Sequence, residues 1–127
     1  MGNRRELCKF PADGTRRASL RKTIMDKIAA LREILAMDAG NSFARYGVAM
    51  ELAGRGDTAA ALDEFDTLLT NDPGYTAGYF MAAQTLATAG RKDEAAARLR
   101  GGIESARRSG NQHALSEMQA MLDDLER

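Results

Sequence analysis

The sequence predicts an all-α protein built from antiparallel helix-hairpin repeats, an α-solenoid with a capping helix at each end. The first observation is a repeat with a period of 34 residues and no gap, which is typical of stacked-repeat architectures. The second is that each unit carries two apolar stripes at helical spacing, separated by a glycine-containing break. The aligned pairs include Asp38 with Asp72, Leu52 with Leu86, Gly56 with Gly90, Ala61 with Ala95, and Phe65 with Leu99.

Length and charge divide the chain into an arm and a body. The 127 residues have the length of one domain. Residues 1–18 hold little apolar material, so we expect a flexible basic arm ahead of a helical domain at 19–127. Residues 1–24 carry seven Lys and Arg against two Asp and Glu, whereas the rest carries 11 against 16. The front of the chain is therefore basic and the body mildly acidic.

Cysteine usage and hydropathy bear on the compartment. Cys8 is the single cysteine, so no disulfide can form within one chain, and a reducing, cytoplasmic location is expected. No apolar run is long enough for a membrane span or for the core of a secretory signal.

The first expected helix is a leading helix at 19–37, with Ser19 as its N-cap. In the 34-residue register it corresponds to the second helix of a repeat whose first helix is missing. Such a helix can serve as an N-terminal cap that turns its charged residues to water. Its apolar stripe comprises Ile24, Ile28, Leu31, Ile34 and Leu35.

Two full repeats and a closing helix follow. Repeat 1 spans 42–70, with helices at 42–54 and 58–70, and Asp57 is expected to cap the second of these through its side chain. Repeat 2 spans 76–108, with helices at about 76–89 and 92–108 and a tight turn at Gly90. A capping helix at 111–126 begins at Asn111, its N-cap, and covers the last repeat.

The pattern resembles the tetratricopeptide repeat family. The resemblance covers roughly residues 38–108, and three features of this chain depart from the family. Arg45 stands where the family has a bulky apolar residue, and Arg107 replaces the closing Pro. Gly101-Gly102 occupies the second helix of the second copy, where the first copy has Thr67-Leu68. These departures indicate that the second copy is a terminal unit. The residues that carry the resemblance are Ala49, Gly56, Asp57, Ala61, Phe65, Leu68, Asp72 and Pro73 in the first copy, and Tyr79, Ala83, Gly90, Ala95 and Leu99 in the second.

The resemblance implies that the first helices of the repeats line a concave groove and the second helices form the outer wall. We therefore expect a module for protein–protein interaction or scaffolding that binds a partner peptide or helix, or a second copy of itself, through this groove. The Lys, Asn and Arg residues with which some family members grip a C-terminal carboxylate are replaced here, which argues against that specificity. The expected partner-binding residues are Phe43, Tyr46, Met50, Ala77, Phe80 and Gln84, with Ala53, Gly54, Ala87 and Thr88 beside them.

Two alternatives stay open. The leading helix or a second copy could cover the groove as core, and an apolar face left open favours a homodimer. The basic arm could instead bind nucleic acid or an acidic membrane surface through phosphate contacts. Only Phe10 interrupts its charges, so base stacking is not indicated and a solvated tail is the preferred interpretation.

Catalytic chemistry is not expected. His113, the single histidine, has no spacing that links it to a nucleophile, and we interpret it as a surface or capping residue. Asp63, Glu64 and Asp66 are interpreted as a solvated helix face. Gly54-Arg55-Gly56-Asp57 lacks the Lys-Ser/Thr pair of a phosphate-binding loop. We therefore predict no catalytic residue, cofactor or metal site, and no enzymatic activity.

Overall fold

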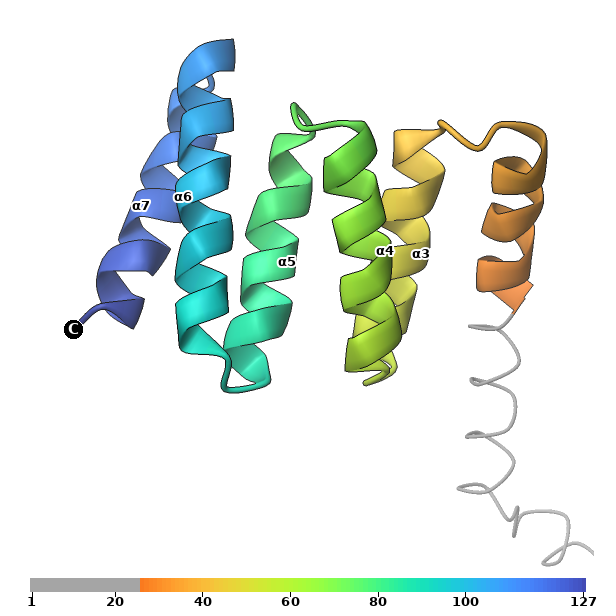
Figure 1. The fold of residues 1–127 in the computed structure, drawn as a ribbon, viewed down its shortest axis with the longest axis horizontal. Helices are drawn as coiled ribbons and strands as arrows, with labels where there is room; N and C mark the ends of the chain where they lie inside the picture. Colours follow the sequence, from red (N-terminus) through yellow and green to blue (C-terminus); the bar gives the residue numbers. More distant parts are fainter. Residues whose placement is uncertain (1–25) are drawn as a thin grey trace, which may run out of the picture.

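The structure is a computed structural model that describes residues 26–127, in which helices and short turns account for the whole fold and no strand occurs. The helices succeed one another along the long axis of the molecule (Figure 1). Residues 26–37 form the described part of the leading helix. The others are α3 (Ser42–Gly54), α4 (Thr58–Asn71), α5 (Thr76–Thr88), α6 (Lys92–Ser109) and α7 (Gln112–Leu125).

The helices pack as hairpins arranged in two rows. α3 packs on α4 to form one hairpin, and α5 packs on α6 to form the next. The two hairpins contact each other where α4 packs on α5. α3 contacts α5 and α5 contacts α7, so these three helices form the inner row. Ion pairs connect the leading helix to α4, through Arg32 and Glu64, and α4 to α6, through Asp66 and Arg98. These helices form the outer row, as the family resemblance implies.

Small residues lie buried between the packed helices. Ala61 and Ala95, which the 34-residue shift superimposes, are fully buried in two successive core clusters. Phe65 and Leu99 occupy the same place in each repeat and are also fully buried. The predicted all-α hairpin fold, with matched small and large side chains nesting between helices, is therefore confirmed.

The turn chemistry explains why the helix ends could be predicted to within one residue. Gly56 and Gly90 follow the first helix of each repeat with φ of 86° and 81°, which an L side chain rarely adopts. The side chain of Asn41 accepts a hydrogen bond from Ala44 N at 2.9 Å, and that of Asn111 accepts one from Ala114 N at 3.1 Å. The predicted N-cap at Asn111 is confirmed.

The Gly101-Gly102 pair has a packing reason. A Cβ added at Gly102 would lie 2.6 Å from Cβ of Tyr79 and would also clash with the sulfur of Met118. A Cβ at Gly101 would lie 3.0 Å from the Tyr79 ring. α6 therefore lies so close to both α5 and α7 that it has no room for side chains at these positions.

Two expectations about helix residues are wrong. Asp57 stands at the N-cap position of α4, but its exposed side chain makes no capping hydrogen bond. Ile34, placed in the buried stripe of the leading helix, is 44% exposed because no described helix covers it. The basic arm at 1–18, Ser19 and Ile24 lie outside the described residues.

Candidate functional site

The inner row holds a first hollow, called here the aromatic hollow, between α3, α5 and α7. It has a volume of about 270 Å³ and is mainly apolar in its lining. α3 supplies Tyr46, and α5 supplies Ala77, Phe80 and Met81, because these residues recur at spacings of three and four along one helix face. α7 closes the hollow from the other side. Its contributions include Ala114, Glu117 and Met118.

A second hollow, the Met50 hollow, adjoins the first along the C-terminal halves of α3 and α5. Its volume is about 350 Å³, and it is lined in part by Met50, Met81 and Gln84. Met81 lines both hollows, so the two are contiguous. The hydroxyls of Thr85 and Thr88 donate to carbonyls one turn back in their own helix, at 2.8 and 2.9 Å. The Gln84 amide and the Thr58 hydroxyl are the other side-chain polar groups in the lining of the Met50 hollow.

The structure brings five of the six expected binding residues to these hollows. Tyr46, Ala77 and Phe80 line the aromatic hollow, and Met50 and Gln84 line the Met50 hollow. Phe43 lines neither, since it lies in the first turn of α3 with 74% of its surface exposed. Of the flanking residues, Ala53, Gly54 and Thr88 lie in the Met50 hollow.

Tyr46 belongs partly to the core. Its ring meets Phe65 edge-on with centroids 6.5 Å apart, and lies 5.3 Å from the ring of Tyr75. Burial raises the pKa of Tyr46 above its ordinary value, and the neighbouring Tyr75 adds to the shift. Burial likewise raises the pKa of Tyr75, with a smaller contribution from Asp72. Tyr46 therefore supports the floor of the aromatic hollow as well as lining it.

The contribution of α7 was missed at the level of sequence. A second shift of 34 residues takes Phe80 to Ala114 and Gln84 to Met118, and both residues line the aromatic hollow. The 34-residue register could therefore have predicted that α7 lines the hollow, although we expected only a capping role for this helix from the sequence. His113 lies at the surface, as expected, with Nε2 3.5 Å from a carboxylate oxygen of Glu117. Both residues line the hollow.

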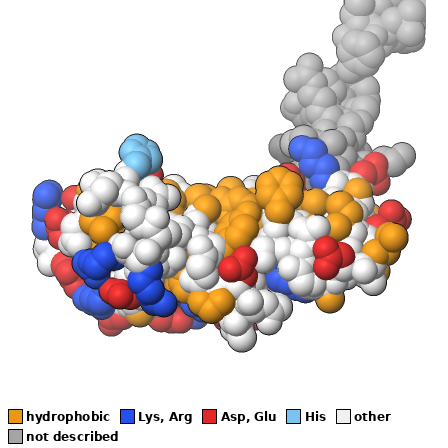
Figure 2. Space-filling model, turned by 90° about the horizontal axis from the view of Figure 1, so that it is seen from above, with side chains coloured by type: hydrophobic (Ala, Val, Ile, Leu, Met, Phe, Trp, Pro, Cys, Tyr) orange, Lys and Arg blue, Asp and Glu red, His pale blue; other side chains and the backbone are white. Residues whose placement is uncertain are grey.

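The described part of the leading helix does not cover the inner row. Residues 26–37 pack beside α3, where Leu31 fills the space next to Gly47, and none of them lines either hollow. Within the described residues, the structure therefore does not support the alternative in which the leading helix covers the groove. Figure 2 shows apolar side chains gathered in a band between the pale-blue His113 and the grey residues. Charged side chains of both signs lie mainly outside this band.

Comparison with known proteins identifies the family. A family model described as tetratricopeptide repeat matches residues 52–121. The chain belongs to the tetratricopeptide repeat family. It is 32% identical to a tetratricopeptide repeat domain protein from Salinibacter ruber, with a TM-score of 0.65 over 68% of this chain and 87% of that one. No curated protein sequence matches the chain.

Two further solved structures share the fold at lower identity. The type III secretion translocator chaperone SycD of Yersinia enterocolitica is 16% identical, with a TM-score of 0.74 over 99% of this chain and 92% of that one. The same chaperone in complex with a peptide of the translocator YopD is 17% identical, with a TM-score of 0.74 over 87% and 85%. At these identities the likeness shows the fold alone.

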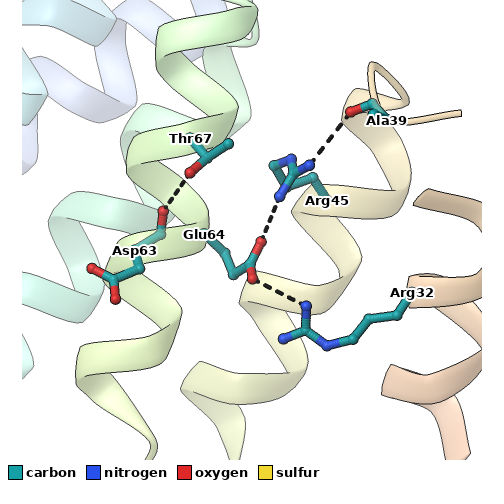
Figure 3. A network of polar contacts seen from close by, with 6 residues as sticks. All are labelled: Arg32, Ala39, Arg45, Asp63, Glu64 and Thr67. Atoms are coloured by element: carbon teal, nitrogen blue, oxygen red, sulfur yellow. Dashed lines mark hydrogen bonds and ion pairs between the residues drawn. The ribbon is translucent and has the colours of Figure 1, made fainter. Parts of the chain in front are cut away.

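Arg45, the departure from the tetratricopeptide repeat pattern, is explained by a polar network between three helices (Figure 3). Its Nη1 donates to Glu64 at 2.9 Å, and its Nη2 donates to the Ala39 carbonyl at 3.4 Å. Arg32 of the leading helix donates to the other oxygen of Glu64 at 3.3 Å. The side chains of Arg45 and Glu64 are only 18% and 15% exposed. The prediction of a solvated acidic face is therefore wrong for Glu64.

Across 26–127, no group of three or more His, Cys, Asp and Glu side chains is arranged to hold a metal ion. No helix in the same part of the chain is long and apolar enough to cross a membrane.

Proposed function

We propose that the protein is an interaction module that binds a peptide or helix of another protein along its inner helix row, without catalysis. The observation that carries this proposal is the pair of contiguous hollows on that row. Both are predominantly apolar, and both continue across helices of different repeats. We further propose a cytoplasmic setting, because the single Cys8 suits a reducing compartment.

The sizes of the hollows favour side chains over a bound cofactor. Ligand sites for small molecules usually enclose roughly 300 to 1,000 Å³. Of the two hollows, the one of about 270 Å³ lies just below that range and the one of about 350 Å³ lies at its lower end, and both are open at the surface. Two shallow hollows in line suit a segment that inserts one apolar side chain into each.

The chemistry of the lining favours a segment with adaptable apolar anchors. Met50, Met81 and Met118 are flexible and polarizable, so they can repack around different partner side chains. Phe80 adds a rigid aromatic surface whose burial releases water. Gln84 can hydrogen-bond the backbone of an extended segment, which would fix its position along the row.

A related fold offers a precedent. The SycD chaperone, which shares this arrangement of helices, has been solved with a peptide of the translocator YopD. The precedent supports peptide binding by a helix-hairpin array of this size. The kind of partner that this chain binds is inferred from the residues that line its own hollows.

The test uses a phage-displayed library of random peptides selected on the full-length protein. Peptides that emerge are titrated against Ala77→Arg, which places a long charged side chain in the aromatic hollow. Ala97→Arg makes the same change at an exposed alanine of α6 in the outer row. We expect Ala77→Arg to weaken binding at least about tenfold, which corresponds to about 1.4 kcal/mol, and Ala97→Arg to leave it unchanged.

Two outcomes would contradict the proposal. One is equal binding to both arginine variants. The other is binding that disappears between low and physiological salt, which is the behaviour of a charged arm rather than an apolar hollow. Tyr46→Ala is a poor probe for this purpose, because Tyr46 also packs against Phe65 and its loss would destabilise the fold.

A further inference from the structure

The leading helix occupies the place of a second helix in the repeat register. A shift of 34 residues takes Ile28 to Leu62 and Leu35 to Leu69. Both pairs are buried, so the leading helix faces α3 as α4 faces α5. The register therefore predicts how exposed every other residue of the leading helix should be.

Ile34 breaks that correspondence. Its equivalent, Leu68, is 1% exposed and lies against the start of α3, close to Ser42 and Arg45. Ile34 is 44% exposed. Leu68 lies between Gly78 of α5 and the start of α3, the first helix of its own hairpin. No described helix stands to Ile34 as α3 stands to Leu68. One face of the leading helix is thus apolar and uncovered.

This face is a continuous stripe. Ala30, Ile34 and Met37 follow at spacings of four and three and are all exposed. The large hydrophobic residues that are exposed within 26–127 are Ile34, Met37 and Phe43, so they concentrate at this end of the array. Scattered apolar residues are normal on a surface, but a concentrated apolar patch indicates a contact site.

We propose that this stripe is the interface with a second copy of the chain, formed by two leading helices packed antiparallel. A two-fold axis near Arg32 brings the small Ala30 beside the partner's Ile34, and the same contact recurs by symmetry. Each isoleucine then lies against the space that an alanine leaves, which is the usual way for two helices to approach closely.

Charges along one edge of the stripe match this arrangement. Lys27 precedes Ala30 and Asp38 follows Met37, so an antiparallel pair places each Lys27 near the partner's Asp38. Lys27 is well exposed and lies 3.9 Å from Glu51, which leaves it able to turn toward a partner. Asp26 and Glu33 lie on the opposite edge, where each Glu33 comes close to the partner's Glu33 and opposes association.

The first experiment measures the mass of the full-length protein by sedimentation velocity over a range of concentrations. We expect a concentration-dependent dimer. Ala30→Glu, in the centre of the stripe, should raise the dissociation constant at least about tenfold, and Ala36→Glu should leave it unchanged. Both alanines are exposed on the same helix, so the two variants differ only in the face that they alter. Circular dichroism checks that both remain folded.

The second experiment tests the antiparallel register by mixing. Lys27→Glu alone and Asp38→Lys alone each place like charges at both ends of the pair, so each variant should dimerise more weakly than the wild type, by about tenfold. An equimolar mixture restores opposite charges at both ends and should dimerise as the wild type does. Glu33→Gln should tighten the dimer.

Three results would overturn the proposal. They are a wild-type monomer at every concentration, equal dimerisation of Ala30→Glu and Ala36→Glu, and a mixture that is no more dimeric than its components. The first would also be the result if residues 1–25 of the same chain cover the stripe. None of these results bears on peptide binding by the inner row, which uses other residues.

Discussion

Gly102 shows at the scale of one residue how closely the helices approach. Gly102→Ala should destabilise the protein by about 1–3 kcal/mol, because the added Cβ would overlap with Tyr79 and Met118. Gly54→Ala is the matched control, since nothing lies within 4 Å of the Cβ it would add. That substitution should stabilise the protein by about 0.4–1 kcal/mol, because alanine lowers the conformational entropy of the unfolded chain. Urea unfolding of both variants makes the comparison, and equal effects would contradict the packing described for α6.

Tyr46 gives a prediction about alkaline pH. Burial raises the pKa of Tyr46 in the folded protein above the ordinary value of 10.0, so folding favours the protonated phenol. The corresponding stability is fully present below about pH 10 and is lost as the pH rises through the raised pKa. Thermal unfolding between pH 8 and about 11 should therefore show a falling Tm. The Tm of Tyr46→Phe should fall less steeply with pH. Parallel plots of Tm against pH for the two proteins would contradict the assignment to Tyr46.

The pairing of Arg45 with Glu64 could not be predicted from the sequence. An acidic residue on an amphipathic helix usually faces water, and nothing near Glu64 in the chain indicates otherwise. Its partners lie 19 and 32 residues away on two other helices. The pairing could be recognised only once the helices were placed. Likewise, the exposure of Phe43 depends on where the first turn of α3 points, which periodicity alone does not determine.

At the scale of elements, the caps distinguish two helix starts that look alike in the sequence. Asn111→Ala removes a side-chain bond to the first turn of α7 and should cost about 1 kcal/mol. Asp57→Ala removes a side chain with no capping bond and should cost a few tenths of a kcal/mol. Chemical denaturation of the two variants, with Asn41→Ala as a second capped site, provides the test. A cost at Asp57 as large as at Asn111 would show that Asp57 caps α4 in solution.

The helix boundaries could be predicted because Gly, Asn and Pro residues between the stripes interrupt helical hydrogen bonding at defined places. Gly56 and Gly90 adopt backbone conformations that end one helix and start the next. The residues that line the two hollows could be predicted only in part. Tyr46, Phe80 and Met50 were expected from the family resemblance. The part played by α7 was overlooked, although the 34-residue register aligns Ala114 with Phe80 and Met118 with Gln84.

At the scale of the whole molecule, the protein is a short array with two separate surfaces. The inner row carries the two hollows, and the N-terminal end of the outer row carries the apolar stripe of the leading helix. A dimer through that stripe would leave both hollows without a direct contact from it, because the stripe supplies no residue to them. Two copies could then present two inner rows to one partner and bind it with greater avidity.

The methionines offer the most direct measurement of the central proposal, that a partner segment occupies the inner row. Met50, Met81 and Met118 line the hollows, whereas Met37 lies at the far end of the leading helix. The full-length protein, labelled at its methionine methyl groups, is titrated with a library-selected peptide and followed by NMR. We expect the methyl signals of Met50, Met81 and Met118 to shift and that of Met37 to stay unchanged. Shifts at Met37 alone, with the three hollow methionines unmoved, would contradict it.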